Sequence, residues 1–157
     1  MISGLVPRYD VVLLDTGAGI SDVVLFAVSL ASEVLMVATP EPTSLTDAYA
    51  TIKVLVGQQD RQQVRLIVNQ TTRAGSGQAI TRQLQQVLDR FVVDGLGRPF
   101  RLAHLGDIPS APEVRQAVMR RQLLMQAAPN CTAAAAIAEI ARALEMLVIP
   151  KAGRAQT

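Results

Sequence analysis

The chain has 157 residues, half of them apolar, which is enough for one globular domain with a sizeable core. A formal net charge of +2 excludes the strongly basic composition typical of nucleic-acid binders. A single cysteine, Cys131, excludes an internal disulfide, and with no signal peptide in the sequence we expect a cytoplasmic protein. The most apolar run, Val23 to Thr39, is interrupted by Ser29, Ser32 and Glu33, which argues against a membrane-spanning helix.

The first predicted element is a buried strand that delivers an acidic residue to a turn. Val11 to Leu14 are consecutive apolar residues, the pattern of a parallel strand covered on both faces, and Asp15 follows at once, before Gly17 and Gly19. Ligands of open α/β sheets bind beyond the carboxyl ends of the strands, so Asp15 could order water around Mg²⁺ beside a phosphate. A helix N-cap is the alternative interpretation of Asp15, and the two glycines favour the ligand site.

Helices and strands then alternate along the chain, which predicts an α/β fold with an open parallel sheet and flanking helices in a Rossmann-like three-layer arrangement. The predicted elements after the first strand are helix 20–31, strand 33–39, helix 44–57, strand 64–69, helix 78–89, strand 100–105, a helix opening at Pro112 and a last helix capped by Asn130 or Thr132. We expect one domain over residues 1–149 and a disordered tail over 150–157.

Other polar residues each have two interpretations. Asn69 ends a strand on the same rim as Asp15, where its amide could read a base edge or could be an ordinary turn residue. Gly75-Ser76-Gly77 stands between a strand and a helix, but without a following lysine we interpret it as a connector. His104 lies in an apolar strand with no neighbouring cysteine or histidine, so we interpret it as a packing residue and not a metal ligand.

Scattered arginines raise the question of an anionic partner. A nucleic-acid or acidic-lipid face would need several of them to converge in space. We favour the interpretation that they lie on solvated helix surfaces, and we expect no nucleic-acid partner. The arginines in question are Arg82, Arg90, Arg101, Arg115, Arg120 and Arg121.

Four stretches of the sequence together resemble one family. They are YDVVLLDTGAGIS (9–21), ATPEPTSLTDAYATIKVL (38–55), LIVNQ (66–70) and LGDIPSAPEVRQAV (105–118). The chain resembles the MinD/ParA-type P-loop ATPases of the SIMIBI class over nearly its whole length, from Tyr9 to about Leu147. Within that family, the first two stretches are most similar to the flagellar number and placement regulators of the FlhG/FleN (YlxH-like) branch.

The resemblance implies roles for individual residues around ATP and Mg²⁺. Asp15 would be the Walker B acid, catalytic through its hold on Mg²⁺ by way of water, and Gly17 and Gly19 would respond to the γ-phosphate. The resemblance further implies that Asn69, Asp107 and Pro109 contact the nucleotide base, and that Glu41, Ser44 and Asp47 lie near the interface of an ATP-bound homodimer. Protein partners in flagellar assembly or regulation would follow, with a peripheral position at the inner membrane left open because no targeting helix is evident.

The family's phosphate-binding Walker A loop has no counterpart in this sequence. There is no GxxxxGK[ST] motif, and Lys53 and Lys151 both lie outside glycine-rich turns. We therefore expect the C-terminal part of such an ATPase, inactive alone, with an unfilled slot where the family has a strand between 11–15 and 33–39. A non-catalytic interaction module and another branch, such as partition ATPases or cobyrinate diamide synthase-like enzymes, are the alternatives.

Overall fold

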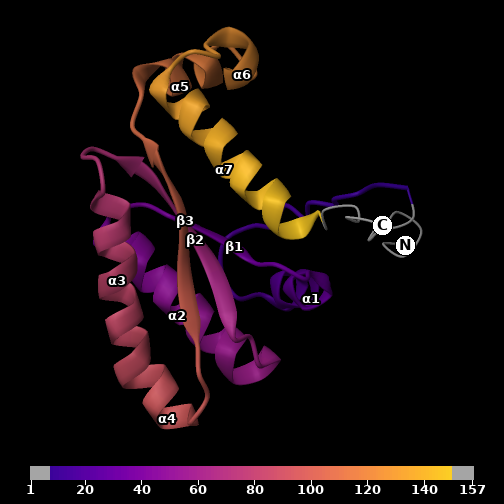
Figure 1. Cartoon of the computed structure of the whole chain (residues 1–157), viewed down its shortest axis with the longest axis vertical. Coiled ribbons are helices and arrows are strands. Elements are labelled where there is room, and N and C mark those ends of the chain that lie inside the picture. The colour runs from indigo at the N-terminus through magenta and orange to yellow at the C-terminus, as the bar shows by residue number, and fades with distance from the viewer. Residues whose placement is uncertain (1–7, 150–157) are drawn as a thin grey trace, which may run out of the picture.

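The computed structural model describes residues 8–149, and within them a parallel sheet forms the centre of the fold (Figure 1). Its three strands are β1 (Leu35–Ala38), β2 (Gln63–Thr71) and β3 (Arg101–Pro109), in the order β1-β2-β3. Val37 of β1 lies opposite Ile67 of β2. The predicted open parallel sheet is confirmed, with β2 as its central strand.

Helices connect these strands and cover both faces of the sheet. In Figure 1, α2 and α3 lie on one side of the strands and α7 on the other. The predicted three-layer arrangement is therefore observed for this part of the chain. The helices are α1 (Asp22–Leu30), α2 (Pro42–Gln59), α3 (Ser76–Leu88), a π-helical turn η2 (Asp89–Val93), α4 (Asp94–Leu96), α5 (Pro112–Met119), α6 (Leu124–Ala127) and α7 (Thr132–Val148).

The main hydrophobic core fills the space between the sheet and the α2–α3 layer. Ile52 and Leu55 of α2 and Leu88 of α3 pack with Leu66 of β2, and all four side chains are fully buried or nearly so. Burying one such side chain contributes about 1.5–3 kcal/mol, so this layer supplies most of the driving force for folding.

On the opposite face, α7 lies close against β3. A Cβ atom at Gly106 of β3 would stand 2.5 Å from Cγ1 of Ile140, so only glycine lets α7 approach this far. Ala133 and Ala134 at the start of α7 are fully buried for the same reason, because small side chains permit close packing. The alanine run therefore has a packing role in addition to its helix propensity.

The strand predicted at Val11–Leu14 is not present. These residues run as an irregular segment, and Leu13 is 74% exposed. A strand forms only when its backbone N–H and C=O groups meet a neighbouring strand, and β1 pairs with β2 alone. The prediction of a strand at this position is therefore wrong for the described residues, because no ladder partner lies next to Val11–Leu14 within residues 8–149.

Several predicted boundaries shift for local reasons. Helix α2 begins at Pro42, earlier than predicted, because proline suits the first helical turn. The Ser44 hydroxyl does not cap α2; it accepts a hydrogen bond of 2.9 Å from the Thr39 N–H. Helix α7 is capped by neither Asn130 nor Thr132 but by Cys131, whose Sγ accepts from the Ala134 N–H at 3.4 Å. The predicted tail at 150–157 lies outside the described residues.

Candidate functional site

A cavity of about 960 Å³ lies between the irregular segment 9–19 and strand β1. Residues from α2 and the end of α7 close its remaining sides. Five of the residues singled out in the sequence line this one cavity: Asp15, Gly17, Gly19, Ser44 and Asp47. The fold thus brings together residues more than 30 positions apart in the chain.

Asp15, Gly17 and Gly19 are all solvent-exposed at this cavity. The Asp15 side chain is exposed, and added Cβ atoms at Gly17 and Gly19 would meet nothing within 4 Å. Gly19 has φ of +98°, a conformation that residues with a side chain rarely adopt. The glycines therefore leave the backbone open to close approach by another group, which is the property a phosphate-binding turn requires.

The turn after β1 is fixed by hydrogen bonds of its own. Ser44 holds the Thr39 N–H, and the Thr39 hydroxyl oxygen is buried without a hydrogen-bond partner among the described residues. Glu41 is the N-cap residue of α2 but makes no side-chain capping bond, and it does not line the cavity with Ser44 and Asp47. The three residues implied to lie near a dimer interface are thus spread along the N-terminal end of α2, with only Ser44 and Asp47 at the cavity.

The residues implied to contact a base lie on a second part of the same rim. Asn69 is opposite Ile108 and Thr71 is opposite Pro109 in the β2–β3 register. The Asn69 side-chain oxygen accepts from the Gln70 N–H at 2.9 Å, and Gln70 takes a left-handed conformation with φ of 59°. This bond stabilises the bend at the end of β2 and leaves the Asn69 amide nitrogen as the group available to a ligand.

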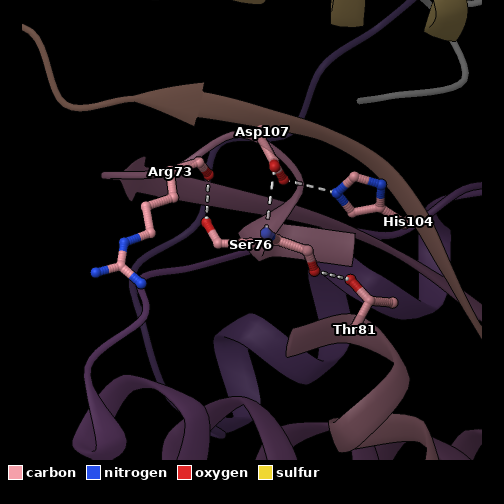
Figure 2. Close-up of polar contacts among 6 residues, drawn as sticks. Arg73, Ser76, Thr81, His104 and Asp107 are labelled. Atoms are coloured by element: carbon pink, nitrogen blue, oxygen red, sulfur yellow. Dashed lines mark hydrogen bonds and ion pairs between the residues drawn. The ribbon is translucent and has the colours of Figure 1, made fainter. Parts of the chain in front are cut away.

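Asp107 is engaged within the protein, as Figure 2 shows. Its carboxylate lies 2.7 Å from Nε2 of His104 and accepts from the Gly77 N–H at 3.2 Å, at the start of α3. A Cβ atom at Gly77 would collide with this carboxylate, which explains the glycine. Asp107 therefore ties β3 to α3, a contact that the sequence did not predict.

A bulge in β3 makes the pairing of His104 with Asp107 possible. Residues three apart on a regular strand point to opposite faces. Leu66 of β2 is opposite His104 and the next residue, Ile67, is opposite Gly106, so one extra residue, Leu105, is inserted between them. The insertion returns His104 and Asp107 to the same face. The glycine in Leu105-Gly106 was the available sequence signal for this irregularity.

The donor set at the cavity fits one mode of binding Mg²⁺. Magnesium is usually held through one or two carboxylates together with water and substrate phosphates, and Asp15 with Asp47 nearby provides that much. Among residues 8–149 there is no group of three His, Cys, Asp or Glu side chains that could hold a metal by themselves. Phosphate oxygens would therefore complete the coordination.

None of the helices within residues 8–149 is both long and apolar enough to cross a membrane.

Comparison with known proteins identifies the class and then the branch. No family model matches the chain. The solved structure of the MinD cell division protein of Aquifex aeolicus superposes with a TM-score of 0.66 and 26% identity, covering 97% of this chain and 61% of that one. This likeness defines a P-loop NTPase-like α/β fold of the MinD type.

Two curated relatives give the branch. The antiactivator FleN of Pseudomonas aeruginosa is 34% identical over 148 residues, and the flagellum site-determining protein YlxH of Helicobacter pylori is 30% identical over 156 residues. The matches cover 94% and 96% of this chain and 51% of each relative, so the chain spans about half the length of the curated relatives it matches. Over nearly its whole length the chain is therefore similar to flagellar regulators of the MinD/ParA type, represented by FleN and YlxH.

Proposed function

We propose that this chain acts as the C-terminal part of an ATP-gated dimeric switch that helps to set flagellar number or placement. Its similarity to FleN and YlxH over about half the length of each supports a role in that process. The observation that carries the nucleotide role is the convergence of Asp15, Gly17, Ser44 and Asp47 on one cavity beside the open edge of β1.

In this proposal the cavity has two parts with different occupants. Its apolar part, between Val11–Leu14 and β1, receives a parallel strand that carries the phosphate-binding loop. Val37 on the open side of β1 is 57% exposed. Strands are spaced about 4.8 Å apart, so an inserted strand could pair with β1 on one side and with Val11–Leu14 on the other.

The opposite edge of the sheet supports this interpretation by contrast. At the start of β3, the side chain of Gln85 in α3 accepts from the Leu102 N–H and donates to the Phe100 carbonyl at 3.2 Å. A side chain thus satisfies backbone groups at the start of β3, as expected for a sheet edge that does not pair with a further strand. Strand β1 has no such side-chain partner among residues 8–149, so its edge is suited to pairing.

The polar part of the cavity is the proposed nucleotide end. When bound, Mg²⁺ would neutralise charge that develops on the phosphates of ATP. Asp15 would hold a metal-bound water, and the backbone at Gly17 and Gly19 would approach the terminal phosphate. The Asn69 amide and the backbone at Pro109 would face the base. Asp107 would act indirectly, by holding the start of α3 and the bulge of β3 in place.

The remaining parts of the proposal concern partners and location. Glu41, Ser44 and Asp47 would lie near the interface of the ATP-bound homodimer, since all three lie at the N-terminal end of α2, beside the cavity that Ser44 and Asp47 line. Protein partners would belong to flagellar assembly or its regulation. We propose a cytoplasmic protein, with any contact at the inner membrane peripheral.

The test is to fuse the chain to a segment of FleN and measure ATP turnover. The chain alone should give no heat with Mg-ATP by calorimetry, whereas its fusion to the part of FleN that it does not match should bind and hydrolyse ATP. In the fusion, Asp15→Asn should reduce turnover by about a hundredfold or more, because the metal loses its anchoring carboxylate. Asp22→Asn, in exposed helix α1, is the matched control and should leave turnover unchanged.

Two results would contradict the proposal. Micromolar Mg-ATP affinity in the chain alone would show that no added strand is needed. Unchanged turnover in the Asp15→Asn fusion would remove the metal role. A well-folded fusion that neither binds ATP nor dimerises would favour the interaction-module alternative.

A further inference from the structure

A second surface, away from the cavity, combines apolar and basic side chains on two short helices. Helices α5 and α6 lie at the opposite end of the molecule from α4 (Figure 1). Val118, Met119 and Leu123 are all about 70% exposed, with 75% the largest value, for Met119. We call the α5–α6 patch the surface formed by these three residues with Arg115, Arg120 and Arg121.

Helical spacing places the apolar residues that α5 contributes to the α5–α6 patch on the outer face of the helix. Val114 and Ala117 point inward from α5, and Ala117 is buried. Arg115, Val118 and Met119 are spaced i, i+3 and i+4, so they share the outer face. A helix of eight residues that already buries one stripe has no structural need for a second apolar stripe on its solvent side.

In the turn after α5, an arginine occupies a left-handed backbone position that usually holds glycine. Gln122 N–H donates to the Ala117 carbonyl at 2.9 Å and Arg121 N–H to the Val118 carbonyl at 3.0 Å. This is the Schellman motif, in which the C′ residue is left-handed and usually glycine. Arg121 occupies that position with φ of 52°. Backbone strain retained for a particular side chain points to a use for that side chain.

The charges of the α5–α6 patch have no partner in the described chain. None of the three arginines forms an ion pair with a residue between 8 and 149. The sequence contains no Asp or Glu from Val114 to Ala138. The patch thus combines exposed apolar side chains with three arginines that form no ion pair within residues 8–149, and the nearest acidic residue in the sequence is Glu113 in the first turn of α5.

We propose that the α5–α6 patch binds an acidic amphipathic segment of a partner protein. Apolar residues of the segment would pack on Val118, Met119 and Leu123, and its carboxylates would pair with the arginine guanidinium groups, whose geometry suits bidentate binding. The flexible Met119 side chain can adapt to different apolar partners. A second copy of this chain is disfavoured, because a symmetric contact would bring like charges together.

A lipid surface fits the patch less well than a peptide. Helices that lie in a membrane interface are long, with a continuous apolar face that usually includes aromatic residues. Here the two helices have eight and four residues, and the patch contains no aromatic side chain. The short helices with a turn between them instead form a compact surface of the size that one peptide segment covers.

The experiment is a selection from a displayed random-peptide library on the immobilised 157-residue chain, at neutral pH and low salt. Enriched peptides should combine Asp or Glu with Leu, Ile or Met. Their affinity should fall about tenfold for Arg121→Gly and for Met119→Ser, and it should weaken as salt is raised. Arg82→Gln and Val87→Ser, exposed positions on α3, are the matched controls and should change affinity less than about twofold.

Arg121→Gly is informative because it removes the charge while relieving the backbone, so its melting temperature should equal or exceed that of the wild type. A loss of binding in this variant therefore cannot come from misfolding. The proposal is overturned if no acidic apolar peptides are enriched, or if enriched peptides bind Arg121→Gly unchanged. It is also overturned if the arginines mediate binding to phosphatidylglycerol vesicles instead, or if the fusion to FleN loses peptide binding. None of these results depends on ATP, so this proposal and the proposed function fail separately.

Discussion

Strand β2 and the segment Val11–Leu14 both contain runs of apolar residues, but only β2 is paired and buried. Leu66 in β2 is 0% exposed and paired on both sides, by β1 and β3. Leu13 is 74% exposed in a segment with no regular structure. The difference lies in the neighbours and not in the residues, because a strand is stabilised by its ladder partners and by the helices that cover them. An apolar run thus does not form a strand by itself, because pairing with a neighbouring strand decides the outcome.

The strongest test of this comparison truncates one leucine in each place. Leu66→Ala should lower the free energy of unfolding by about 3 kcal/mol, since it leaves a cavity in a packed core. Leu13→Ala should change it by less than about 0.5 kcal/mol, because an exposed side chain loses little burial. Urea unfolding followed by circular dichroism measures both. A large loss of stability from Leu13→Ala would mean that the segment is packed in solution.

A smaller effect is expected from adding a methyl group to a glycine in each region. Gly106→Ala should destabilise the chain by about 2 kcal/mol, because the new Cβ overlaps Ile140 of α7. Gly17→Ala meets no atom within 4 Å and should leave stability nearly unchanged. Urea unfolding followed by circular dichroism measures the change in stability of both variants. If the two variants lose equal stability, α7 does not pack on β3 as described.

Much of the fold could be predicted from the sequence, and the failures have identifiable causes. Apolar runs and helical spacing placed β1, β2, β3, α1, α2, α3, α5 and α7 to within a few residues, but the short helices α4 and α6 and the π-helical turn η2 were not predicted. They could not show that Val11–Leu14 lacks a partner, because pairing is not a local property. The cap of α7 was missed because cysteine is a weak acceptor seldom used for capping, and here its Sγ serves that role.

The candidate site was predictable in part. The strand-end rule brought Asp15 and Gly17 to the rim, and the structure places both at one cavity with Asp47. The family resemblance implied a contact between Asp107 and the base but could not show that its carboxylate is engaged by His104 and Gly77. That outcome depends on a one-residue bulge, which periodicity alone does not reveal.

Removing a carboxylate should distinguish the two acids of the rim. Asp107→Ala should destabilise the chain by about 1.5 kcal/mol, because the Gly77 N–H and His104 lose a partner in a partly buried position. Asp15→Ala should have almost no effect on stability in the chain alone, since its side chain is exposed. A double variant of Asp107 and His104, each to alanine, should lose less than the sum of the single losses. Additive losses would mean that the pair does not interact.

The smallest effect should come from the strained turn after α5. Arg121→Gly should leave stability unchanged or raise it by up to about 1 kcal/mol, because glycine adopts the left-handed conformation without steric penalty. Thermal unfolding measures the difference. Arg120→Gly, one residue earlier in a right-handed conformation, is the matched control and should be destabilising. A clear destabilisation by Arg121→Gly would show that the arginine side chain supports the fold itself.

Amide hydrogen exchange of Val11–Leu14 and β1 tests the account most directly. In the chain alone, the amides of Val11–Leu14 should exchange rapidly while those of Val64–Val68 in β2 stay protected. In the fusion to the part of FleN that the chain does not match, Val11–Leu14 and Leu35–Ala38 should become protected together, as an added strand pairs with both. Rapid exchange of Val11–Leu14 in a folded, ATP-binding fusion would contradict the proposed strand insertion.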